Sequence, residues 1–587
     1  MRLTNIAHLR LPFGRLLGYD TSVLGRGETL PVSFDQRRHV VEGNRPGSWM
    51  ALSFRIDGAV PLDALETAWL AVIARHGTLR TAFDPGENGP RLHEIRLGPG
   101  GWAEHPVGPG QSSGDAIREV LDRACSPYTA PSHRLCLLET AEATTIVIAA
   151  DHAHVDMWSM LVIARDLLTA LERAKAGADP DLPSAPAFAE HTRALRERTE
   201  VPDEVRTRWA EVLRASGGVM PRFPLPLGDD TAQPERVEVR DVLGLDDSAA
   251  FAAQAREEGV STLSLAVSVM TAVTREVADQ PLRALFPVHS RHDETWHDAV
   301  GWFITNSVLE SSDPSPKAAS AAVREAVRLG SWPLEEVLRP WGGMPEAPGI
   351  FAISWLDLRR LPVRIDAAGL EAQYVGASIR TDGVMLWFIL DEQGMHLRCR
   401  YPDTMAARRH VGAWLDALVA RMRSIARSSV STSIRIDESV FRVQRAVRAD
   451  VGVIMALLGD DEVGGATESA EIERYERAYD LVSREGSHFL AVVRAEDDSV
   501  VGTMQLSVMP ALARGGVTRL QIEGFRVAED ERSQGLGAGM LAWAHEHGRR
   551  HGAAIAQVVI DDRYGRALAF YRQHGYEAQQ AGLTRAL

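Results

Sequence analysis

A histidine and an aspartate four residues apart stand in the segment DHAHVDM at residues 151–157. Histidine can accept a proton from an amine or a hydroxyl group near neutral pH, so His152 is a candidate general base. Asp156, if it is buried, needs a cationic partner, and that ion pair would fix the loop. The same spacing is also typical of a core histidine beside a helix cap, so the pattern alone leaves both interpretations open.

A second candidate is the glycine-rich run RSQGLG at residues 532–537. Glycine allows a backbone turn to approach a phosphate group closely. If a helix follows the turn, the free N–H groups of its first turn donate to the phosphate, and the helix dipole favours the anion. Tight packing of the turn is the alternative interpretation.

The elements around both segments must position them. The apolar run 144–151 predicts a strand and residues 158–177 predict a helix, so His152 lies in a strand-to-helix loop, where side chains reach a cleft. Residues 520–527 predict a strand and residues 540–552 a helix on either side of the glycine-rich run. Strand-like and helical patterns alternate elsewhere too, which predicts an α/β (α+β) fold class.

The composition argues against several classes of protein. The chain has 587 residues, 45% hydrophobic and 24% charged, as in globular proteins of about two to four domains. A formal net charge of −15 argues against a nucleic-acid partner, and three cysteines without a C-x-x-C pair argue against a disulfide framework or a thiolate zinc site. No stretch reaches the ~18 uncharged apolar residues of a membrane helix, and charges interrupt the N-terminal region. We therefore expect no membrane partner and a cytoplasmic location.

A Ser/Arg-rich seam near residues 423–439 divides the chain. After it we predict one small α/β domain over residues 441–587, with residues 428–440 as a linker. The first 427 residues are too many for one typical core, so we predict two lobes, about 1–200 and 215–427.

Three further motifs accompany DHAHVDM: SFDQRR (33–38), RHGTLRTAF (75–83) and VGWFITN (300–306). In this order and spacing the set resembles the condensation domains of nonribosomal peptide synthetases, with their S-x-x-Q-x-R, RHExLRTxF, HHxxxDG and VGxFxN motifs. The resemblance covers roughly residues 28–427. It implies a two-lobed, chloramphenicol-acetyltransferase-like fold with a tunnel between the lobes, in which a carrier-bound acyl thioester meets an acceptor nucleophile.

The resemblance also implies roles for individual residues. His152 matches the reacting histidine, Asp156 the motif aspartate and Arg291 the arginine that pairs with it, while Asn306 matches the asparagine beside the tunnel. Two positions depart from the family pattern.

The first motif histidine is Asp151 here, and the motif glycine is Met157, which could narrow the tunnel. Asp151 could hold the neighbouring imidazole, although adjacent residues at a strand end point apart. Because the reacting histidine, His152, is retained, the domain is predicted to be catalytically active. The alternative is a degenerate domain that only binds an acyl carrier.

A cluster of histidines, His289, His292 and His297, has acidic neighbours and could suggest a metal site. Their spacing fits no helix face well, and the segment aligns with a structural stretch of the condensation family. We therefore expect no metal.

The R-x-x-G-x-G form of the second turn, between a strand and a helix, resembles the GNAT N-acetyltransferases. The resemblance includes a hairpin at 488–508 and a closing segment at 567–576, and it covers roughly residues 441–584. It implies acetyl-CoA, or another acyl-CoA, as co-substrate, with the pyrophosphate against residues 534–538 and the thioester near Val527. The residues implied in binding are Val527, Arg532, Gln534, Gly535, Leu536, Gly537 and Ala538.

The chemistry of this second half is carried over in the same way. Tyr571 matches the family tyrosine that protonates the leaving thiolate, and Glu523 is a candidate base, directly or through water; a solvated or ion-paired glutamate is the alternative. Phe570 and Tyr576 are interpreted more simply as residues of the hydrophobic core. Tyr564 replaces a frequent asparagine, so one coenzyme contact could be lost.

Neither a carrier attachment site nor an adenylation domain stands in the sequence, so acyl groups would arrive on a carrier protein in trans or as a free thioester. The combination predicts a bifunctional acyltransferase of specialised metabolism, for example peptide or antibiotic biosynthesis, that acylates small-molecule amines. The alternative is a single-activity GNAT acetyltransferase whose first half only docks a carrier or substrate. A third interpretation, a non-enzymatic scaffold, would require that both acyltransferase sites have lost their activity.

Overall fold

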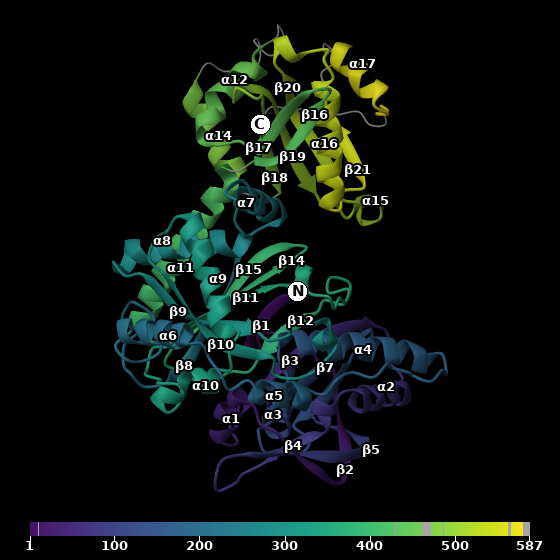
Figure 1. Ribbon diagram of the computed structural model, residues 1–587. Helices are drawn as coiled ribbons and strands as arrows, with labels where there is room; N and C mark the ends of the chain where they lie inside the picture. Colours follow the sequence, from purple (N-terminus) through teal and green to yellow (C-terminus); the bar gives the residue numbers. More distant parts are fainter. Residues whose placement is uncertain (10, 429, 461–470, 485–486, 561–564, 579–587) are drawn as a thin grey trace. The chain divides into compact units, whose positions relative to one another are not determined.

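The computed structural model describes all residues except 10, 429, 461–470, 485–486, 561–564 and 579–587. The described residues divide into two compact units (Figure 1). The first unit comprises Met1–Val242 and Leu263–Leu418. The second comprises Leu243–Thr262 and Val419–Leu587, so a segment from the middle of the chain belongs to the C-terminal unit.

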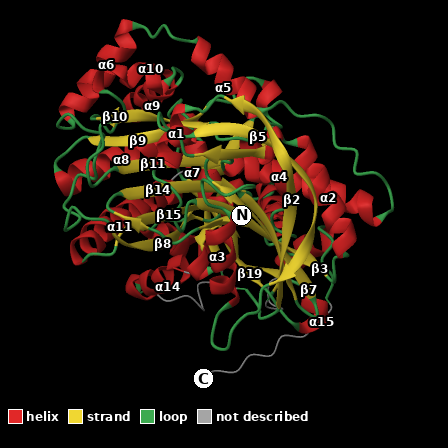
Figure 2. Cartoon of the chain, turned by 90° about the horizontal axis from the view of Figure 1, so that it is seen from below, coloured by secondary structure: helices red, strands yellow, loops and turns green. Residues whose placement is uncertain are grey.

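Over the described residues, the first unit contains two mixed sheets (Figure 2). The first has the spatial order β1 (Arg2–Asn5), β12 (Gln373–Gly376), β3 (Trp49–Asp57), β7 (Ala143–Asp151), β6 (His133–Glu139), β2 (Arg15–Leu30), β5 (Arg91–Glu104) and β4 (Thr81–Asp84). The second has the order β10 (Ile304–Ser311), β9 (Leu282–His289), β11 (Phe351–Asp357), β14 (Val384–Asp391), β15 (Gly394–Pro402), β8 (Gln233–Leu243) and β13 (Arg380–Thr381). Because β12 lies between β1 and β3, the chain returns from the second lobe to complete the first sheet.

Helices flank both sheets of the first unit. They are α1 (Phe34–Val41), α2 (Leu62–Arg75), α3 (Ser113–Ala124), α4 (Met157–Lys175), α5 (Phe188–Glu197), α6 (Asp203–Ala215), α8 (Thr262–Ala278), α9 (Pro316–Gly330), α10 (Leu334–Leu338) and the first part of α11 (Met405–Ser428), which continues into the second unit from Val419. Helices α2 and α4 lie side by side against the first sheet.

Strand β7 explains why the apolar run before the histidine is continuous. Ile146, Ile148 and Ala150 join the core that faces α2 and α4, while Val147 and Ala149 join the core on the other face, which α3 covers. A central strand covered on both faces needs apolar residues at successive positions. The end of β7 is therefore held rigidly, and so is the loop that begins there.

The second unit contains one sheet among its described residues. Its order is β16 (Val430–Ile436), β17 (Ser439–Arg445), β18 (His488–Arg494), β19 (Val500–Met509), β20 (Arg519–Val527) and β21 (Ile555–Val558). Its helices are α7 (Leu245–Glu257), α12 (Val451–Leu458), α14 (Ile472–Arg484), α15 (Ala513–Gly516), α16 (Leu536–Arg550) and α17 (Gly565–Gln573).

The two faces of this sheet are covered by different helices (Figure 1). Phe489 and Ala491 of β18 pack into the core with α16, whereas Leu490 and Val492 pack with α12. Successive residues of a strand point to opposite faces, so β18 separates two helical layers.

The domain boundaries differ from the sequence prediction. Residues 428–440, predicted as a linker, contain strand β16, which pairs antiparallel with β17. Its Ser, Thr, Val and Ile residues have the alternation of a strand, although the segment as a whole has the composition of a loop. The domain predicted over residues 441–587 therefore lacks both β16 and α7.

No single helix in the described part of the chain is both long and apolar enough to cross a membrane. Helices α7 and α8 meet that criterion only when they are taken together.

Candidate active sites

The loop between β7 and α4 is held by backbone and side-chain hydrogen bonds. Asp156 is the N-cap of α4, where its Oδ1 accepts a hydrogen bond from the backbone N–H of Ser159 at 2.7 Å. The backbone N–H of His152 donates to the carbonyl of Ser48 at 2.9 Å. The Gln36 side chain donates to the carbonyl of Ala153 at 2.8 Å, which ties the SFDQRR motif directly to the loop.

Asp156 and Arg291 form the ion pair that the resemblance implies. Arg291 Nη1 lies 2.6 Å from Asp156 Oδ2, and their side chains are 0% and 2% exposed. Burial favours the neutral carboxyl, but Arg291 and Ser159 outweigh it and lower the pKa of Asp156. Asp156 Oδ2 also accepts from the backbone N–H of Phe303 at 3.1 Å. The aspartate thus acts as a structural anchor between the loop and the VGWFITN motif.

His152 lies against the indole of Trp302, with ring centroids 4.2 Å apart. Its Nδ1 is buried and has no hydrogen-bond partner among the described residues. Burial, followed by the nearby His39, lowers the pKa of His152, so the imidazole is neutral near pH 7 and can accept a proton.

Asp151, which replaces a histidine of the family motif, binds a different partner. Its Oδ2 lies 3.2 Å from His39 Nε2, and Arg45 Nη2 lies 3.1 Å from His39 Nδ1. Burial opposes its ionisation, but the hydrogen bond from His39 lowers the pKa of Asp151. The Asp151 carboxylate is therefore held by His39. No motif in the sequence signalled His39, since it follows SFDQRR without belonging to it.

Met157, the other departure, is the first residue of α4 and packs partly against the core of the first lobe. Its backbone carbonyl accepts a hydrogen bond from the Tyr374 hydroxyl at 2.8 Å. The methionine side chain is thus part of the packing at the start of the helix.

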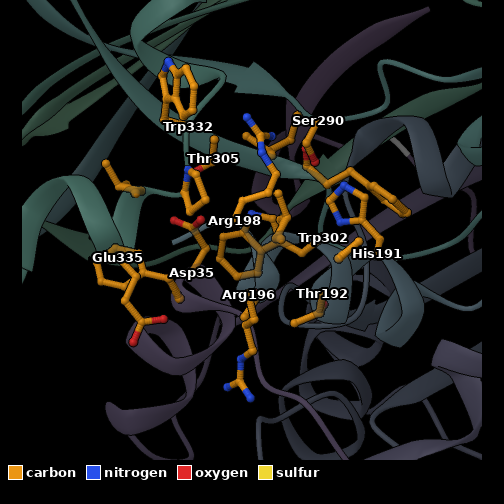
Figure 3. A pocket seen from close by; sticks show the side chains of 18 of the residues that line it. Asp35, His191, Thr192, Arg196, Arg198, Ser290, Trp302, Thr305, Trp332 and Glu335 are labelled. Atoms are coloured by element: carbon orange, nitrogen blue, oxygen red, sulfur yellow. The ribbon is translucent and has the colours of Figure 1, made fainter. Parts of the chain in front are cut away.

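A cavity of about 290 Å³ has parts of the SFDQRR and VGWFITN motifs in its wall (Figure 3). Its wall includes the aromatic side chains Phe34, Phe188, Trp296, Trp302, Phe303 and Trp332. Because Trp302 lines the cavity and also contacts the His152 ring, it joins the candidate base to this space.

Four carboxyl groups lie on the wall of the cavity, those of Asp35, Asp293, Glu335 and Glu336, and Asp35 belongs to the SFDQRR motif (Figure 3). Burial raises the pKa of Asp35 to about 6, although Arg38 and the nearby Thr305 and Asn306 side chains oppose the shift. Asn306 therefore lies beside the cavity through its contact with Asp35.

The remaining motifs connect the same elements. The Thr78 hydroxyl donates to the carbonyl of Val300 at 2.6 Å, so RHGTLRTAF and VGWFITN meet. Ser159 Oγ donates to the carbonyl of Gly301 at 2.9 Å. A side chain at Gly301 would collide with the Phe188 ring, since its Cβ would lie 2.4 Å from that ring. These motifs therefore serve to position the loop.

The glycine-rich turn of the second unit lies between β20 and α16, as predicted. Ser533 has φ of 66° and Gly535 has φ of 93°, so the backbone curls before the helix begins at Leu536. The first N–H groups of a helix have no carbonyl one turn earlier to bind. The amides from Leu536 to Ala538 are therefore donors at a helix N-terminus, which fits a phosphate.

Two polar side chains of this turn, those of Arg532 and Gln534, already have partners. Arg532 Nη2 lies 2.7 Å from Asp460 Oδ2, and its Nε donates to the carbonyl of Val527 at 3.0 Å. The Gln534 side chain donates to the carbonyl of Asp530 at 2.7 Å. Arg532 therefore braces the turn, and the donors left for a phosphate are the backbone amides, with Gly537 contributing no side chain.

Tyr571 is buried in α17, near Phe525 and Tyr576. Burial raises the pKa of its hydroxyl to about 12, so it keeps its proton at neutral pH and can donate it. Tyr576 packs against the same core and lies 2.8 Å from His545 through its hydroxyl. Glu523 is exposed on β20, beside the backbone irregularity at Gly524. Tyr564 lies outside the described residues.

Two family models match the chain. The model of the condensation domain matches residues 27–328, which is more than half of the chain. The chain belongs to the condensation-domain family. The model of the acetyltransferase (GNAT) family matches residues 454–576, so the C-terminal unit is a GNAT domain. Both families transfer acyl groups, and acyl transfer is the reaction class of this enzyme.

Curated relatives agree with this assignment. Acyltransferase PapA3 of Mycobacterium tuberculosis is 25% identical over 442 residues, which is 69% of this chain and 91% of the relative. A probable non-canonical nonribosomal peptide synthetase, CymA of Salinispora arenicola, is 30% identical over 325 residues, 51% of this chain and 4% of that protein.

Solved structures confirm the predicted fold class of the first unit. PapA2 acyl transferase superposes with a TM-score of 0.66 at 18% identity, covering 73% of this chain and all (100%) of that one. The first condensation domain of the CDA synthetase gives a TM-score of 0.55 at 13% identity, covering 68% of this chain and 97% of that one. The two-lobed condensation fold is thus present.

Proposed function

We propose that the chain is a bifunctional acyltransferase of specialised metabolite biosynthesis. Its first half would join a carrier-bound acyl group to an amine or hydroxyl acceptor, and its second half would transfer an acyl group from CoA to an amine. The observation that carries the proposal is the position of His152, which lies on Trp302 beside the aromatic cavity in a loop fixed by the Asp156–Arg291 pair.

In the first half, His152 would accept the proton of the attacking amine or hydroxyl. The nucleophile forms a bond to the thioester carbonyl carbon, the C–S bond breaks, and the carrier thiol leaves with a proton. The aromatic cavity is suited to an apolar acyl chain or an aromatic part of a substrate. The relatives named above, an acyltransferase and a peptide synthetase, support acyl transfer and a carrier protein as partner.

In the second half, acyl-CoA would lie with its pyrophosphate on the amides from Leu536 to Ala538. Glu523 would take a proton from the acceptor ammonium, directly or through water. Tyr571 would donate its proton to the thiolate as the C–S bond breaks, which its raised pKa supports.

The test is to incubate the full chain with labelled acetyl-CoA, acyl-loaded carrier proteins and amines, and to look for two products. His152→Ala should lower condensation roughly 10²–10⁴-fold and leave CoA-dependent acylation intact, because a positioned base contributes that much. Tyr571→Phe should do the reverse: CoA binding is kept, while thiol release slows. Full condensation by the His152→Ala protein would refute the first half of the proposal.

The alternative is a GNAT acetyltransferase whose first half only docks a carrier. The Asp151–His39 pair favours it, because the family histidine is replaced by a carboxylate with a partner of its own. In that case the wild-type chain would bind loaded carrier protein and give only the CoA-dependent product.

A further inference from the structure

Helix α7 presents an acidic residue to the end of α16 within the second unit. Asp246 lies in the first turn of α7, whereas His547 and His551 lie at the C-terminal end of α16. Residues four apart on a helix share one face, so both imidazoles are on the same side of α16. One ligand atom from each of the three residues lies within 4.8 Å of the other two.

The spacing of these atoms is close to that of a tetrahedral metal site. Asp246 Oδ2 lies 3.6 Å from His547 Nδ1 and 3.3 Å from His551 Nε2. Nitrogen and oxygen ligands at about 2.0–2.1 Å from a tetrahedral Zn²⁺ ion lie roughly 3.3–3.4 Å from one another. Small side-chain movements would therefore bring all three atoms to bonding distance.

Both histidines are oriented by neighbours, as metal-binding histidines usually are. His551 Nδ1 lies 2.8 Å from the carbonyl oxygen of His547, so this nitrogen carries the proton and leaves Nε2 as the ligand atom. The His547 ring lies against Phe489 and Trp543, with centroids 5.0 and 5.3 Å away.

The strongest single observation is the nitrogen of His547 that faces Asp246. His547 is 2% exposed, and its Nδ1 has no hydrogen-bond partner among the described residues. A buried polar atom without a partner destabilises the folded state, and a metal ion would satisfy it.

Two arginines, Arg445 and Arg550, lie near the site, and Arg445 has a carboxylate partner of its own. Arg445 Nε lies 3.5 Å from Asp247 Oδ1, and the guanidinium lies over the Phe489 ring. Asp247 therefore compensates Arg445, which leaves Asp246 to face the two imidazoles.

We propose that Asp246, His547 and His551 bind a divalent transition-metal ion of the Zn²⁺ class, with water as a fourth ligand. Imidazole and carboxylate ligands in this number suit Zn²⁺ better than Ca²⁺ or Mg²⁺, which prefer six or more oxygens. The ion joins α7 to α16, so its role is structural: it fastens a segment from the middle of the chain onto the GNAT domain.

The test uses the full chain, stripped with a chelator and titrated calorimetrically with Zn²⁺, and with Co²⁺ as a spectroscopic probe of the ligand field. We expect one high-affinity ion per chain. Asp246→Asn and His551→Gln should each weaken binding by roughly 10–100-fold or more. Matched controls are Glu546→Gln, an exposed carboxylate on α16 paired with Arg549, and His545→Gln on the same helix; both should bind like wild type.

A thermal series separates a metal site from a plain ion pair. Zn²⁺ should raise the melting temperature of the stripped wild-type chain and of both controls, but not of Asp246→Asn or His551→Gln. If Asp246→Asn does not fold, His551→Gln decides, since this side chain is 23% exposed. No tight binding by the wild type, or equal binding by all variants, would overturn the proposal and leave an Asp–His ion pair.

Discussion

The loop at residues 151–156 and the turn at residues 532–538 are positioned in different ways. The loop depends on side chains from distant segments: Gln36 binds its backbone, Arg291 neutralises its aspartate, and Trp302 lies against its histidine. The turn offers contiguous backbone amides at the start of α16, and the unusual φ of Gly535 shapes it.

This difference determines what each site tolerates. A site assembled from buried side chains is damaged by a change at any of several distant positions, because each change leaves a charge or polar group without its partner. A site made of backbone amides tolerates most side-chain changes. It is sensitive only where a substitution alters the course of the backbone.

The largest effect is expected for the buried ion pair. Asp156→Ala and Arg291→Ala should each destabilise the first unit by about 3–5 kcal/mol, because each leaves the other charge buried and unpaired. The double variant should be no less stable than either single variant. Denaturant unfolding of the three proteins measures this coupling, and additive losses would contradict direct pairing.

Two controls sharpen this prediction. Asp156→Asn keeps a side-chain oxygen for the N-cap of α4 but removes the charge, so it separates the loss of the cap from the loss of the pair. Asp403→Ala breaks a pair with Arg408 that is exposed to solvent, and its unfolding midpoint should change little.

A smaller effect is expected at the turn. At a hundredfold excess over Kd, acetyl-CoA should stabilise the second unit by about 2.7 kcal/mol. Gly535→Val should abolish this gain, because a β-branched residue at φ of 93° must change the backbone that aims the amides. The nearest atom to a Cβ there is Ile436 Cγ2 at 3.4 Å, so the cause is backbone strain.

Gly552 provides the matched control. It has φ of 77° and lies just beyond the other end of α16, and a Cβ added to it would meet open space, with no contact within 4 Å. Gly552→Val should suffer similar backbone strain yet keep the full acetyl-CoA stabilisation in a calorimetric titration. If Gly535→Val binds as tightly as wild type, the turn does not hold the coenzyme.

The sequence predicted those parts of the sites that local patterns encode. The apolar run before His152 and the strand and helix around Gly535 are continuous in sequence, so their periodicity suffices. The partner of Asp156 came from the resemblance alone, since nothing in the spacing of Asp156 and Arg291 indicates that two residues 135 positions apart meet.

What the sequence did not predict depends on contacts across long separations. His39 meets Asp151, and Asp246 meets His547 and His551, only because the fold brings separate elements together. Histidines that are close in sequence, such as His289 and its neighbours, are visible as a possible metal cluster, whereas the group shared by α7 and α16 is not. Strand β16 was missed because its composition is that of a loop and only its pairing with β17 makes it a strand.

The smallest effect is a displacement of the pH profile of condensation. His152 must be neutral to accept a proton, and burial and His39 lower its pKa, so the rate should fall on the acid side only below the ordinary histidine value of about 6.5. His39→Gln removes a neighbour that lowers this pKa and leaves the carboxylate of Asp151, which raises it, without its partner. Both effects raise the pKa of His152. The acid limb of the condensation rate should therefore move to higher pH, whereas the pH profile of the CoA-dependent reaction should stay the same. If the acid limb does not move and only the maximal condensation rate falls, His39 supports the loop but does not influence the pKa of His152.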